Sequence, residues 1–308
     1  MITVAIGVCT VHRPVMLQKC LESLARQEVP VDVAPTIVVA DNEAAASNRV
    51  LVENFVTTCP IPVRYIHEPR RGISMARNAI LEAALDLAAD WIAFIDDDET
   101  AAPDWLAELM AAATRYNADV IQGRVEPVYP EPTPFWVVRP TKRREGEVRT
   151  STSTANVLFS ASLIRPSEAG LRFDEDFALT GGGDIDFFAR AHRAGASIFY
   201  SDKPCTFEYW PPERCTYRWQ IFRAFSASVN NTRRERSERS AWRHAIKALT
   251  TTIGGVLTLI EAAIFAPISS HRFKRQALRG GKRLAAAAGR IAALTGYRAE
   301  PYRRIRGF

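Results

Sequence analysis

Short apolar runs alternate with stretches of helical periodicity along most of the chain. Four mostly apolar runs, expected to form buried strands, are residues 2–8, 36–40, 63–66 and 91–95. Four stretches with apolar side chains three and four residues apart, expected to form helices, are residues 15–27, 44–55, 74–89 and 105–116. Strands and helices that alternate in this way are typical of α/β folds. We therefore predict a Rossmann-like, mostly parallel sheet with helices on both faces.

The pattern is less regular further along the chain. Residues 119–123 and 196–200 are again apolar enough to form strands, and residues 184–194 have helical spacing and end at a glycine. Between these elements, residues 126–150 are rich in proline and then in charge, which predicts a long irregular loop. We place a main α/β domain at residues 1–230 and a basic helical tail at residues 231–308.

Three carboxylates follow the strand predicted at residues 91–95. Asp96, Asp97 and Asp98 are adjacent, and burying three like charges without a partner would be costly. A divalent cation removes that cost, since Mg²⁺ and Mn²⁺ prefer carboxylate oxygen together with the phosphates of a substrate. We therefore predict a metal ion bound to a diphosphate at this strand end. The alternative is a solvated acidic turn before the next helix.

Other polar residues also follow predicted strands. The loop from Thr10 to Arg13 comes after the first strand, and Asp41 comes after the second. Ligands of parallel sheets bind beyond the carboxyl ends of the strands. We therefore expect these residues and the acidic row to lie along one edge.

A cluster of arginines precedes the helix predicted at residues 74–89, with Ser74 as its expected N-cap. Arg70, Arg71 and Arg77 make this helix entry electropositive, which suits an anion. The alternative is a surface loop whose arginines pair with nearby acids.

The composition is that of a globular protein, since 47% of the residues are hydrophobic. The five cysteines contain no Cys-x-x-Cys pair, which favours a reducing cytoplasm over a disulfide scaffold. The N-terminus lacks the basic start of a signal peptide. The net charge of +6 is uneven, because residues 233–308 hold 17 Lys and Arg against 4 Asp and Glu. Such a tail is expected to meet an anionic surface, and no nucleic-acid motif accompanies it.

The tail contains an apolar stretch at residues 245–268. Thirteen apolar or small residues precede Glu261, fewer than the ~20 that a membrane span needs. Basic residues flank this stretch, and a second amphipathic stretch follows at residues 284–294. The pattern favours helices that lie in a membrane interface with their cations toward anionic lipid. The alternatives are a helical hairpin packed on the main domain or on a partner subunit, and a true transmembrane span.

Five motifs in a fixed order identify a family. They are VCTVHR at residues 8–13, VVADN at 38–42, RGISMARN at 71–78, FIDDD at 94–98 and TGGGDIDFF at 180–188. With these motifs the chain resembles the family 2 glycosyltransferases of the GT-A fold, and most closely the bacterial exopolysaccharide enzymes of the succinoglycan glucosyltransferase type. The resemblance covers roughly residues 1–225. It implies a nucleoside diphosphate sugar bound at the strand ends.

The resemblance also assigns the residues around the nucleotide. Asp41 matches the carboxylate that accepts a hydrogen bond from the uracil N–H, and Thr10 and Arg13 match the loop beneath the base. Arg71 and Arg77 match the segment that contacts the donor.

The acidic row takes further roles by resemblance. Asp97 matches the position that holds the ribose, and Asp98 matches the ligand of Mn²⁺ or Mg²⁺. Asp96 is expected to join the metal site directly or through water. A metal ion there would neutralise the leaving diphosphate as a Lewis acid.

The family's general base is an aspartate in an acidic pair after two glycines, and here the pair is reduced to Gly183-Asp184. We assign Asp184 as the base and keep Asp186 as the alternative. A single in-line attack would invert the anomeric configuration. The structural alternative is that Asp184 is only a charge that stabilises the start of a helix.

Processive relatives carry a Gln-x-x-Arg-Trp motif, which departs here to Arg214-Cys-Thr-Tyr-Arg-Trp219. By resemblance Arg218 would touch the diphosphate, and Trp219 would stack on the acceptor sugar. A purely structural role for Trp219 is the alternative. Asn156, which follows the long loop, is assigned with Trp219 to the acceptor. The departure from the motif argues for transfer of a single sugar.

The resemblance therefore implies a metal-dependent inverting glycosyltransferase. We expect it to move one sugar, with glucose as the default, from a UDP-sugar to a lipid-linked oligosaccharide in exopolysaccharide or other cell-surface glycan synthesis. The expected location is the cytoplasmic face of the inner membrane, held by residues 233–308 as a peripheral or monotopic protein. One rival is a non-catalytic module that binds a nucleotide sugar or a carbohydrate. Another, a nucleotidyltransferase, lacks its Gly-rich signature loop near the first strand.

Overall fold

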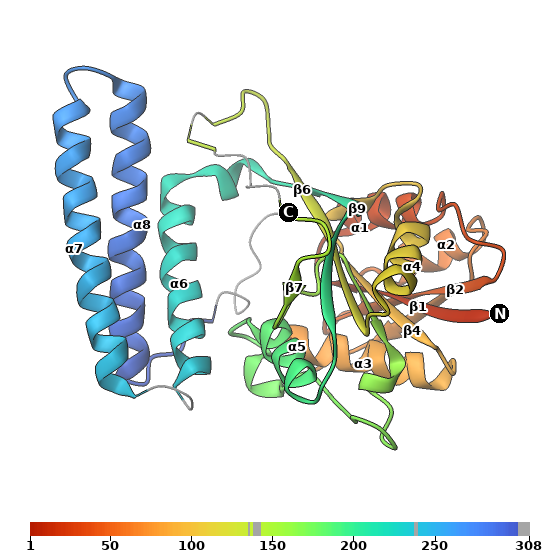
Figure 1. Cartoon of the computed structure of the whole chain (residues 1–308). Coiled ribbons are helices and arrows are strands. Elements are labelled where there is room, and N and C mark those ends of the chain that lie inside the picture. Colours follow the sequence, from red (N-terminus) through yellow and green to blue (C-terminus); the bar gives the residue numbers. More distant parts are fainter. Residues whose placement is uncertain (135, 138–142, 237–239, 301–308) are drawn as a thin grey trace.

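The structure is a computed structural model that describes residues 1–134, 136–137, 143–236 and 240–300 (Figure 1). A nine-stranded sheet forms its centre. The strands are β1 Ile2–Thr10, β2 Val33–Asp41, β3 Val63–His67, β4 Trp91–Asp96, β5 Glu99–Ala101, β6 Val120–Val128, β7 Val148–Arg149, β8 Val157–Ser160 and β9 Ile198–Tyr209. The α-helices are α1 Pro14–Leu24, α2 Arg49–Val56, α3 Ile73–Asp86, α4 Trp105–Tyr116, α5 Gly183–Arg193, α6 Tyr217–Glu235, α7 Ala241–Phe265 and α8 Ser270–Leu294.

The sheet is parallel through its first four strands and mixed beyond them. Its order is β3-β2-β1-β4-β8-β6-β9-β5, with β7 paired to β9. β8 runs antiparallel to both β4 and β6, whereas β6 and β9 are parallel to each other. Since β1, β2 and β4 are parallel, their carboxyl ends share one edge. The register pairs Thr10 with Asp41 and Cys9 with Asp96, so the polar residues predicted for that edge do lie along it.

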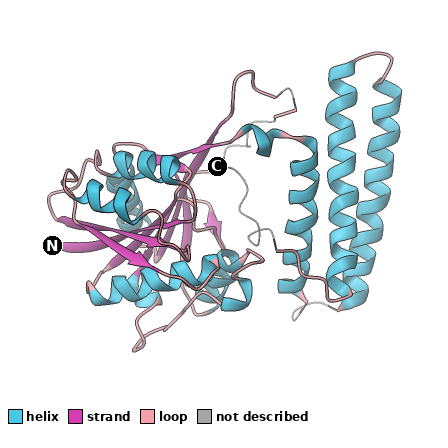
Figure 2. Cartoon of the chain, turned by 180° about the vertical axis from the view of Figure 1, so that it is seen from behind, coloured by secondary structure: helices cyan, strands magenta, loops and turns pink. Residues whose placement is uncertain are grey.

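Helices cover both faces of the sheet, as predicted (Figures 1 and 2). One core cluster joins β1 to buried residues of α1, α2 and α4, and the other joins the sheet to α3 and α5. The central strands are buried on both faces, which is why they are almost continuously apolar. Gly7 of β1 allows a close approach, because a Cβ atom there would lie 2.6 Å from Ile80 and 2.9 Å from Phe94.

Several boundaries differ from the sequence prediction. α3 begins at Ile73 after Gly72, and the Ser74 hydroxyl is buried without a hydrogen bond, so Ser74 is not the N-cap. β9 continues to Tyr209 rather than ending at Tyr200, and the predicted loop at residues 126–150 contributes the end of β6 and the short β7. The short β5 was not predicted.

Three long helices form a separate layer at the C-terminal end. α8 packs against both α6 and α7, and both views show α8 between its two neighbours (Figures 1 and 2). Glycines allow close contact, since a Cβ atom on Gly289 would lie 2.5 Å from the Phe225 carbonyl oxygen of α6. The predicted boundary between residues 230 and 231 therefore falls inside α6, whose partner in packing is α8.

α7 has one face on α8 and one apolar face outward. Its buried residues include Ala248, Gly255 and Ala262. By length and composition α7 could cross a membrane. Only 22% of its most apolar window is buried inside the protein, so α7 is not a core helix. The exposed apolar residues of α7 are Trp242, Ile246, Leu249, Ile253, Val256, Leu257, Ile260 and Ile264.

Candidate active site

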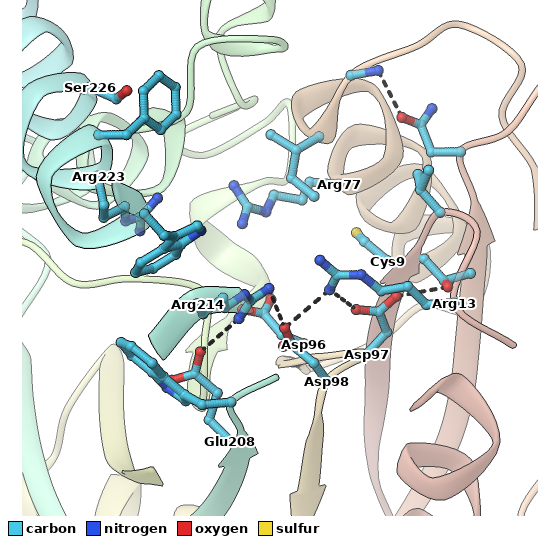
Figure 3. Close-up of a pocket in the computed structure, with 18 of the residues that line it drawn as sticks. Cys9, Arg13, Arg77, Asp96, Asp97, Asp98, Glu208, Arg214, Arg223 and Ser226 are labelled. Atoms are coloured by element: carbon cyan, nitrogen blue, oxygen red, sulfur yellow. Dashed lines mark hydrogen bonds and ion pairs between the residues drawn. The ribbon is translucent and has the colours of Figure 1, made fainter. Parts of the chain in front are cut away.

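A cavity of about 530 Å³ opens at the carboxyl edge of β1, β2 and β4 (Figure 3). Its size is within the ~300–1,000 Å³ of small-molecule sites. One wall comes from the sheet edge and includes Thr10, Arg13 and the acidic row. A second wall comes from the start of α3, and a third from the end of β9 and the helices α6 and α8. The cavity therefore lies between the α/β domain and the C-terminal helices.

Two arginines hold the acidic row. Arg13 donates from Nη1 to Asp97 Oδ1 at 2.9 Å and to Asp98 Oδ2 at 3.1 Å. Arg214 Nη2 lies 2.8 Å from the same Asp98 oxygen, and Arg214 Nη1 lies 3.2 Å from Glu208 Oε1. The Thr10 hydroxyl donates to Asp97 Oδ2 at 2.9 Å. Figure 3 shows these contacts as dashed lines, with Asp98 in contact with both guanidinium groups.

Burial makes it costly to ionise the acidic row unless a positive charge lies nearby. It raises the pKa of Asp96 to about 7, and the neighbouring Asp98 adds to the rise while Arg77 opposes it. Burial also raises the pKa of Asp97 to about 6, against the lowering effect of Arg13. The pKa of Glu208 is likewise raised by burial. The arginines thus offset only part of the cost of ionising these acids, and a further cation would stabilise their charged forms.

The donor chemistry fits a divalent cation. Asp96 and Asp98 offer carboxylate oxygens only, and Mg²⁺ and Mn²⁺ commonly take one or two carboxylates and complete their shell with substrate phosphates. Within the described residues no group of three or more His, Cys, Asp or Glu side chains is arranged to hold a metal ion. Two carboxylates with a phosphate ligand would satisfy the same requirement.

The second wall includes the loop that leads into α3. The side chain of Asn42 holds the backbone of this loop in place. Asn42 Nδ2 donates to the carbonyl oxygens of Glu68 and Arg70, and its Oδ1 accepts from the Gly72 N–H at 2.7 Å. Gly72 has φ of 139°, a conformation that favours glycine. This arrangement brings Arg71 to the cavity wall.

Arg77 reaches the cavity from the first turns of α3. It is 7% exposed, and its guanidinium lies 5.5 Å from the centre of the Phe173 ring. Arg71 and Arg77 both line the cavity, and their contact with a donor stays a prediction, whereas Arg70 forms an ion pair with Glu68 at 2.7 Å. The helix entry is therefore electropositive through Arg71 and Arg77, whereas Arg70 pairs with an acid of the preceding loop.

The third wall carries aromatic residues. Trp210 and Trp219 meet edge to face with 5.5 Å between ring centres, and both line the cavity. Trp219 therefore lines the cavity, and its contact with an acceptor stays a prediction. Arg218 is exposed and lies outside the cavity, so its predicted contact with a diphosphate is not supported. α6 begins at Tyr217, which turns Trp219 inward and leaves Arg218 on another side of the first helical turn.

The two candidate bases differ in their surroundings. Asp186 forms an ion pair with Arg190 of the same helix at 2.8 Å. Asp184 accepts a hydrogen bond only from the N–H of the adjacent Ile185 among the described contacts. Neither residue lines the cavity. The segment before them nevertheless packs on the cavity rim, because the Ile73 N–H donates to the Ala178 carbonyl at 3.0 Å.

Two predicted contacts do not fit the placement of their residues. Asp41 is fully buried and accepts from the Asn48 N–H, Asn48 Nδ2 and the Tyr65 hydroxyl, so it lies behind the cavity wall. Asn156 is also fully buried. Its Oδ1 accepts from Trp105 Nε1, and its Nδ2 donates to two backbone carbonyls. Asn156 therefore ties strands to α4 in the core and is not an acceptor ligand.

Sequence reasoning did not identify several residues of the third wall. Glu208, Arg214, Arg223 and Lys282 all line the cavity. Arg214 is the first residue of the segment Arg214–Trp219, but residue spacing does not show that it precedes α6 in a short 3-10 helix. Lys282 is more than sixty residues further along the chain, and only the packing of α8 on α6 brings it to the site.

The chain matches the family model described as "Glycosyl transferase family 2" over residues 5–174, which is more than half of its length. The chain belongs to glycosyl transferase family 2. The family assignment inferred from the five motifs is thereby confirmed. Succinoglycan biosynthesis protein ExoM of Rhizobium meliloti (strain 1021) is 35% identical over 255 residues, which are 78% of this chain and 79% of ExoM.

Further relatives of this family 2 glycosyltransferase are more distant. The uncharacterized glycosyltransferase YibD of Escherichia coli (strain K12) is 29% identical over 124 residues, which cover 40% of this chain and 34% of YibD. The crystal structure of S. aureus TarS 1-349 in complex with UDP superposes with a TM-score of 0.54 at 14% identity, over 96% of this chain and 92% of that one. The chain spans 55% of the longer TarS structure. These matches confirm the GT-A fold predicted from the motifs.

Proposed function

We propose that this family 2 glycosyltransferase moves a single sugar from a UDP-sugar to a hydroxyl of a lipid-linked oligosaccharide, with inversion at the anomeric carbon. The product would enter exopolysaccharide or other cell-surface glycan synthesis. The observation that carries the proposal is the row Asp96–Asp98 at the strand edge, facing Arg71 and Arg77 across a cavity large enough for a nucleotide sugar. Glucose is the default sugar, in keeping with the resemblance to the succinoglycan enzymes and the relationship to ExoM.

The donor would lie along the sheet edge. Thr10 and Asn42 line the part of the cavity where the base is expected, and Asp97 is held by Thr10 and Arg13 in position for a ribose hydroxyl. Arg71 and Arg77 supply positive charge for the diphosphate at the start of α3, where the helix dipole adds to it. Asp41 supports this edge from behind through Asn48 and Tyr65.

Asp98, with Asp96 beside it, would hold Mn²⁺ or Mg²⁺. When bound, such an ion acts as a Lewis acid that neutralises charge on the departing diphosphate. Arg214 lies next to this proposed metal position, because it contacts both Asp98 and Glu208. We assign Arg214, rather than Arg218, as the arginine that accompanies the diphosphate.

The acceptor would enter from the side of the C-terminal helices. Trp210 and Trp219 offer apolar ring faces for a sugar. Asp184 would take the proton from the attacking hydroxyl, because its carboxylate is not committed to an ion pair whereas that of Asp186 is. An attack opposite the diphosphate gives inversion and needs no covalent intermediate on the protein.

Turnover of nucleotide sugars tests this proposal. Purified protein is incubated with a panel of UDP-, GDP- and dTDP-sugars with Mn²⁺, Mg²⁺ or EDTA, and released nucleoside diphosphate is measured. We expect metal-dependent release from a UDP-sugar, and loss of release in Asp98→Asn. A non-catalytic module would bind UDP without release by the parent protein. Turnover of Asp98→Asn or Asp184→Asn within about threefold of the parent would refute the role of that residue.

The exposed face of α7 supports a membrane location for this activity. Apart from the adjacent Val256 and Leu257, its eight exposed apolar residues recur every three or four positions from Trp242 to Ile264, a stretch of about 33 Å at ~1.5 Å per residue. The neighbouring α8 is basic, with seven Lys and Arg between Arg272 and Arg290 and no Asp or Glu. An apolar face beside many cations suits an anionic bilayer. We propose that α7 lies in the membrane interface at the cytoplasmic face of the inner membrane.

Vesicle binding tests the role of α7 without removing the helices that complete the cavity. The double variant Leu249→Glu with Ile253→Glu places two charges on the outward face, and Val50→Glu, an equally exposed valine on α2, is the control. We expect parent and control to sediment with vesicles that contain anionic lipid, and the double variant to stay in solution. Equal sedimentation of the double variant and the control would refute the membrane assignment.

A further inference from the structure

Two cations reach the cavity from the C-terminal helices. Arg223 belongs to α6 and Lys282 to α8, and both line the same cavity as the acidic row. Figure 3 shows Arg223 on α6 and Arg77 on α3, with the cavity between them. The tail thus contributes charge to a site whose nucleotide residues come from the sheet edge.

Neither cation forms an ion pair with an acidic side chain among the described residues, although the nearby charge of Arg223 opposes the rise in the pKa of Glu208. Lys282 Nζ donates to the neutral Gln220 Oε1 at 3.1 Å. No hydrogen bond or ion pair of Arg223 is found within residues 1–134, 136–137, 143–236 and 240–300. The ion pairs of the cavity acids are made by other arginines, since Asp97 and Asp98 contact Arg13 and Glu208 contacts Arg214. Arg223 and Lys282 therefore carry two positive charges on this wall that form no ion pair with the described residues.

Gln220 fixes where the lysine points. It is 6% exposed, and its Nε2 donates to the Arg214 carbonyl at 3.1 Å while its Oε1 holds Lys282. The ammonium group is thereby kept on the cavity side of α8. A guanidinium fork and a fixed ammonium group are the two side chains that proteins use most for phosphate.

We infer that Arg223 and Lys282 form a second anion subsite that takes a phosphate group. This inference rests on the proposed function for the identity of the substrate, because a phosphate on this wall has two sources in that reaction. It is either the diphosphate of the nucleotide donor or the diphosphate that carries a lipid-linked acceptor. The position on α6 and α8, across the cavity from the start of α3, favours the acceptor.

Binding measured in EDTA tests this subsite without any turnover. Pyrophosphate and UDP are titrated separately into the full chain by calorimetry, and pyrophosphate is also titrated into protein saturated with UDP. The variants are Arg223→Gln, Lys282→Gln and the charge-conserving Lys282→Arg. The control is Arg279→Gln, which removes one charge from α8 at an exposed position outside the cavity. Thermal unfolding checks that each variant is folded.

We expect Arg223→Gln and Lys282→Gln to weaken pyrophosphate binding about tenfold in the presence of UDP, with UDP affinity within twofold of the parent. Lys282→Arg should retain most of the affinity. A tenfold loss of UDP affinity, with no pyrophosphate binding to the UDP complex, would assign the subsite to the donor. The subsite is refuted if the parent binds no pyrophosphate, or if both variants behave as Arg279→Gln does. Failure of sugar transfer would refute the proposed function and leave this result intact.

Discussion

Replacing Arg214 with methionine removes the guanidinium that joins two cavity acids. Arg214 lies 2.8 Å from Asp98 and 3.2 Å from Glu208, and its side chain is only 17% exposed. At an effective dielectric constant of ~20, one such pair gains about 5 kcal/mol before desolvation is subtracted. Removing one partner of a fully buried pair costs ~3–5 kcal/mol. Because Asp98 keeps Arg13, we expect Arg214→Met to lower the free energy of unfolding by about 2 kcal/mol.

The same substitution should change the response to metal. Arg214 occupies an oxygen of Asp98 that a divalent cation would need, so the two compete. Without the guanidinium, Mn²⁺ should bind about tenfold more tightly, which corresponds to ~1.4 kcal/mol. Millimolar Mn²⁺ should then restore much of the lost stability. Urea unfolding with EDTA or Mn²⁺ measures the stability, and electron paramagnetic resonance of free Mn²⁺ measures the affinity.

Arg218→Met is the matched control, because Arg218 is exposed and four residues away on the adjacent helix. It should leave both quantities near those of the parent. If Arg214→Met were as stable as Arg218→Met, the ion pairs would contribute nothing to the fold. If Mn²⁺ bound no more tightly, competition for Asp98 would be refuted.

Three further predictions concern other residues. Asp184→Asn should lower kcat by about 10²–10⁴ with UDP affinity unchanged, and Asp186→Asn should lower it less; the reverse order in transfer assays would exchange their roles. Asn156→Ala should destabilise the protein by about 3 kcal/mol in urea unfolding, because it leaves Trp105 Nε1 and two carbonyls unpaired, and unchanged stability would contradict its structural role. Desolvation raises the pKa of the Cys9 thiol to about 12, so iodoacetamide at pH 8 should label Cys9 slowly until urea unfolds the chain; rapid labelling of Cys9 in the native protein would contradict this raised pKa.

The α/β domain could be predicted because its signals are local. The apolar runs that became β1, β2 and β4 are largely buried, the run at residues 63–66 became the edge strand β3, and the periodic stretch at Trp105–Tyr116 became α4 with the same limits. Parallel strands then place their ends on one edge, so Thr10, Arg13 and the acidic row could be gathered without coordinates.

The extension of β9 shows where local signals end. Asp202, Lys203 and Pro204 interrupt the apolar pattern, and isolated they are typical of a turn. The strand nevertheless continues, because β6 pairs with it on one side and β5 on the other. Glu208 lies on that extension. Because the extension was not predicted, Glu208 was not predicted to line the cavity.

The third wall depends on packing between distant segments. α8 reaches α6 because small residues such as Gly289 allow close contact, and this contact brings Lys282 to the cavity. The predicted alternatives for the tail included a hairpin packed on the main domain, and α8 does pack on α6. The exposed face of α7 belongs to a different prediction, that of the membrane interface.

The central claim is that a metal ion on the acidic row holds the diphosphate of a nucleotide sugar at this sheet edge. A crystal grown with UDP and Mn²⁺, measured at the manganese absorption edge, tests it most directly. We predict an anomalous peak about 2 Å from an Asp98 oxygen and in contact with the diphosphate, with the uracil near Thr10 and Asn42. UDP bound elsewhere, or UDP in the cavity with no manganese peak beside Asp98, would contradict the account.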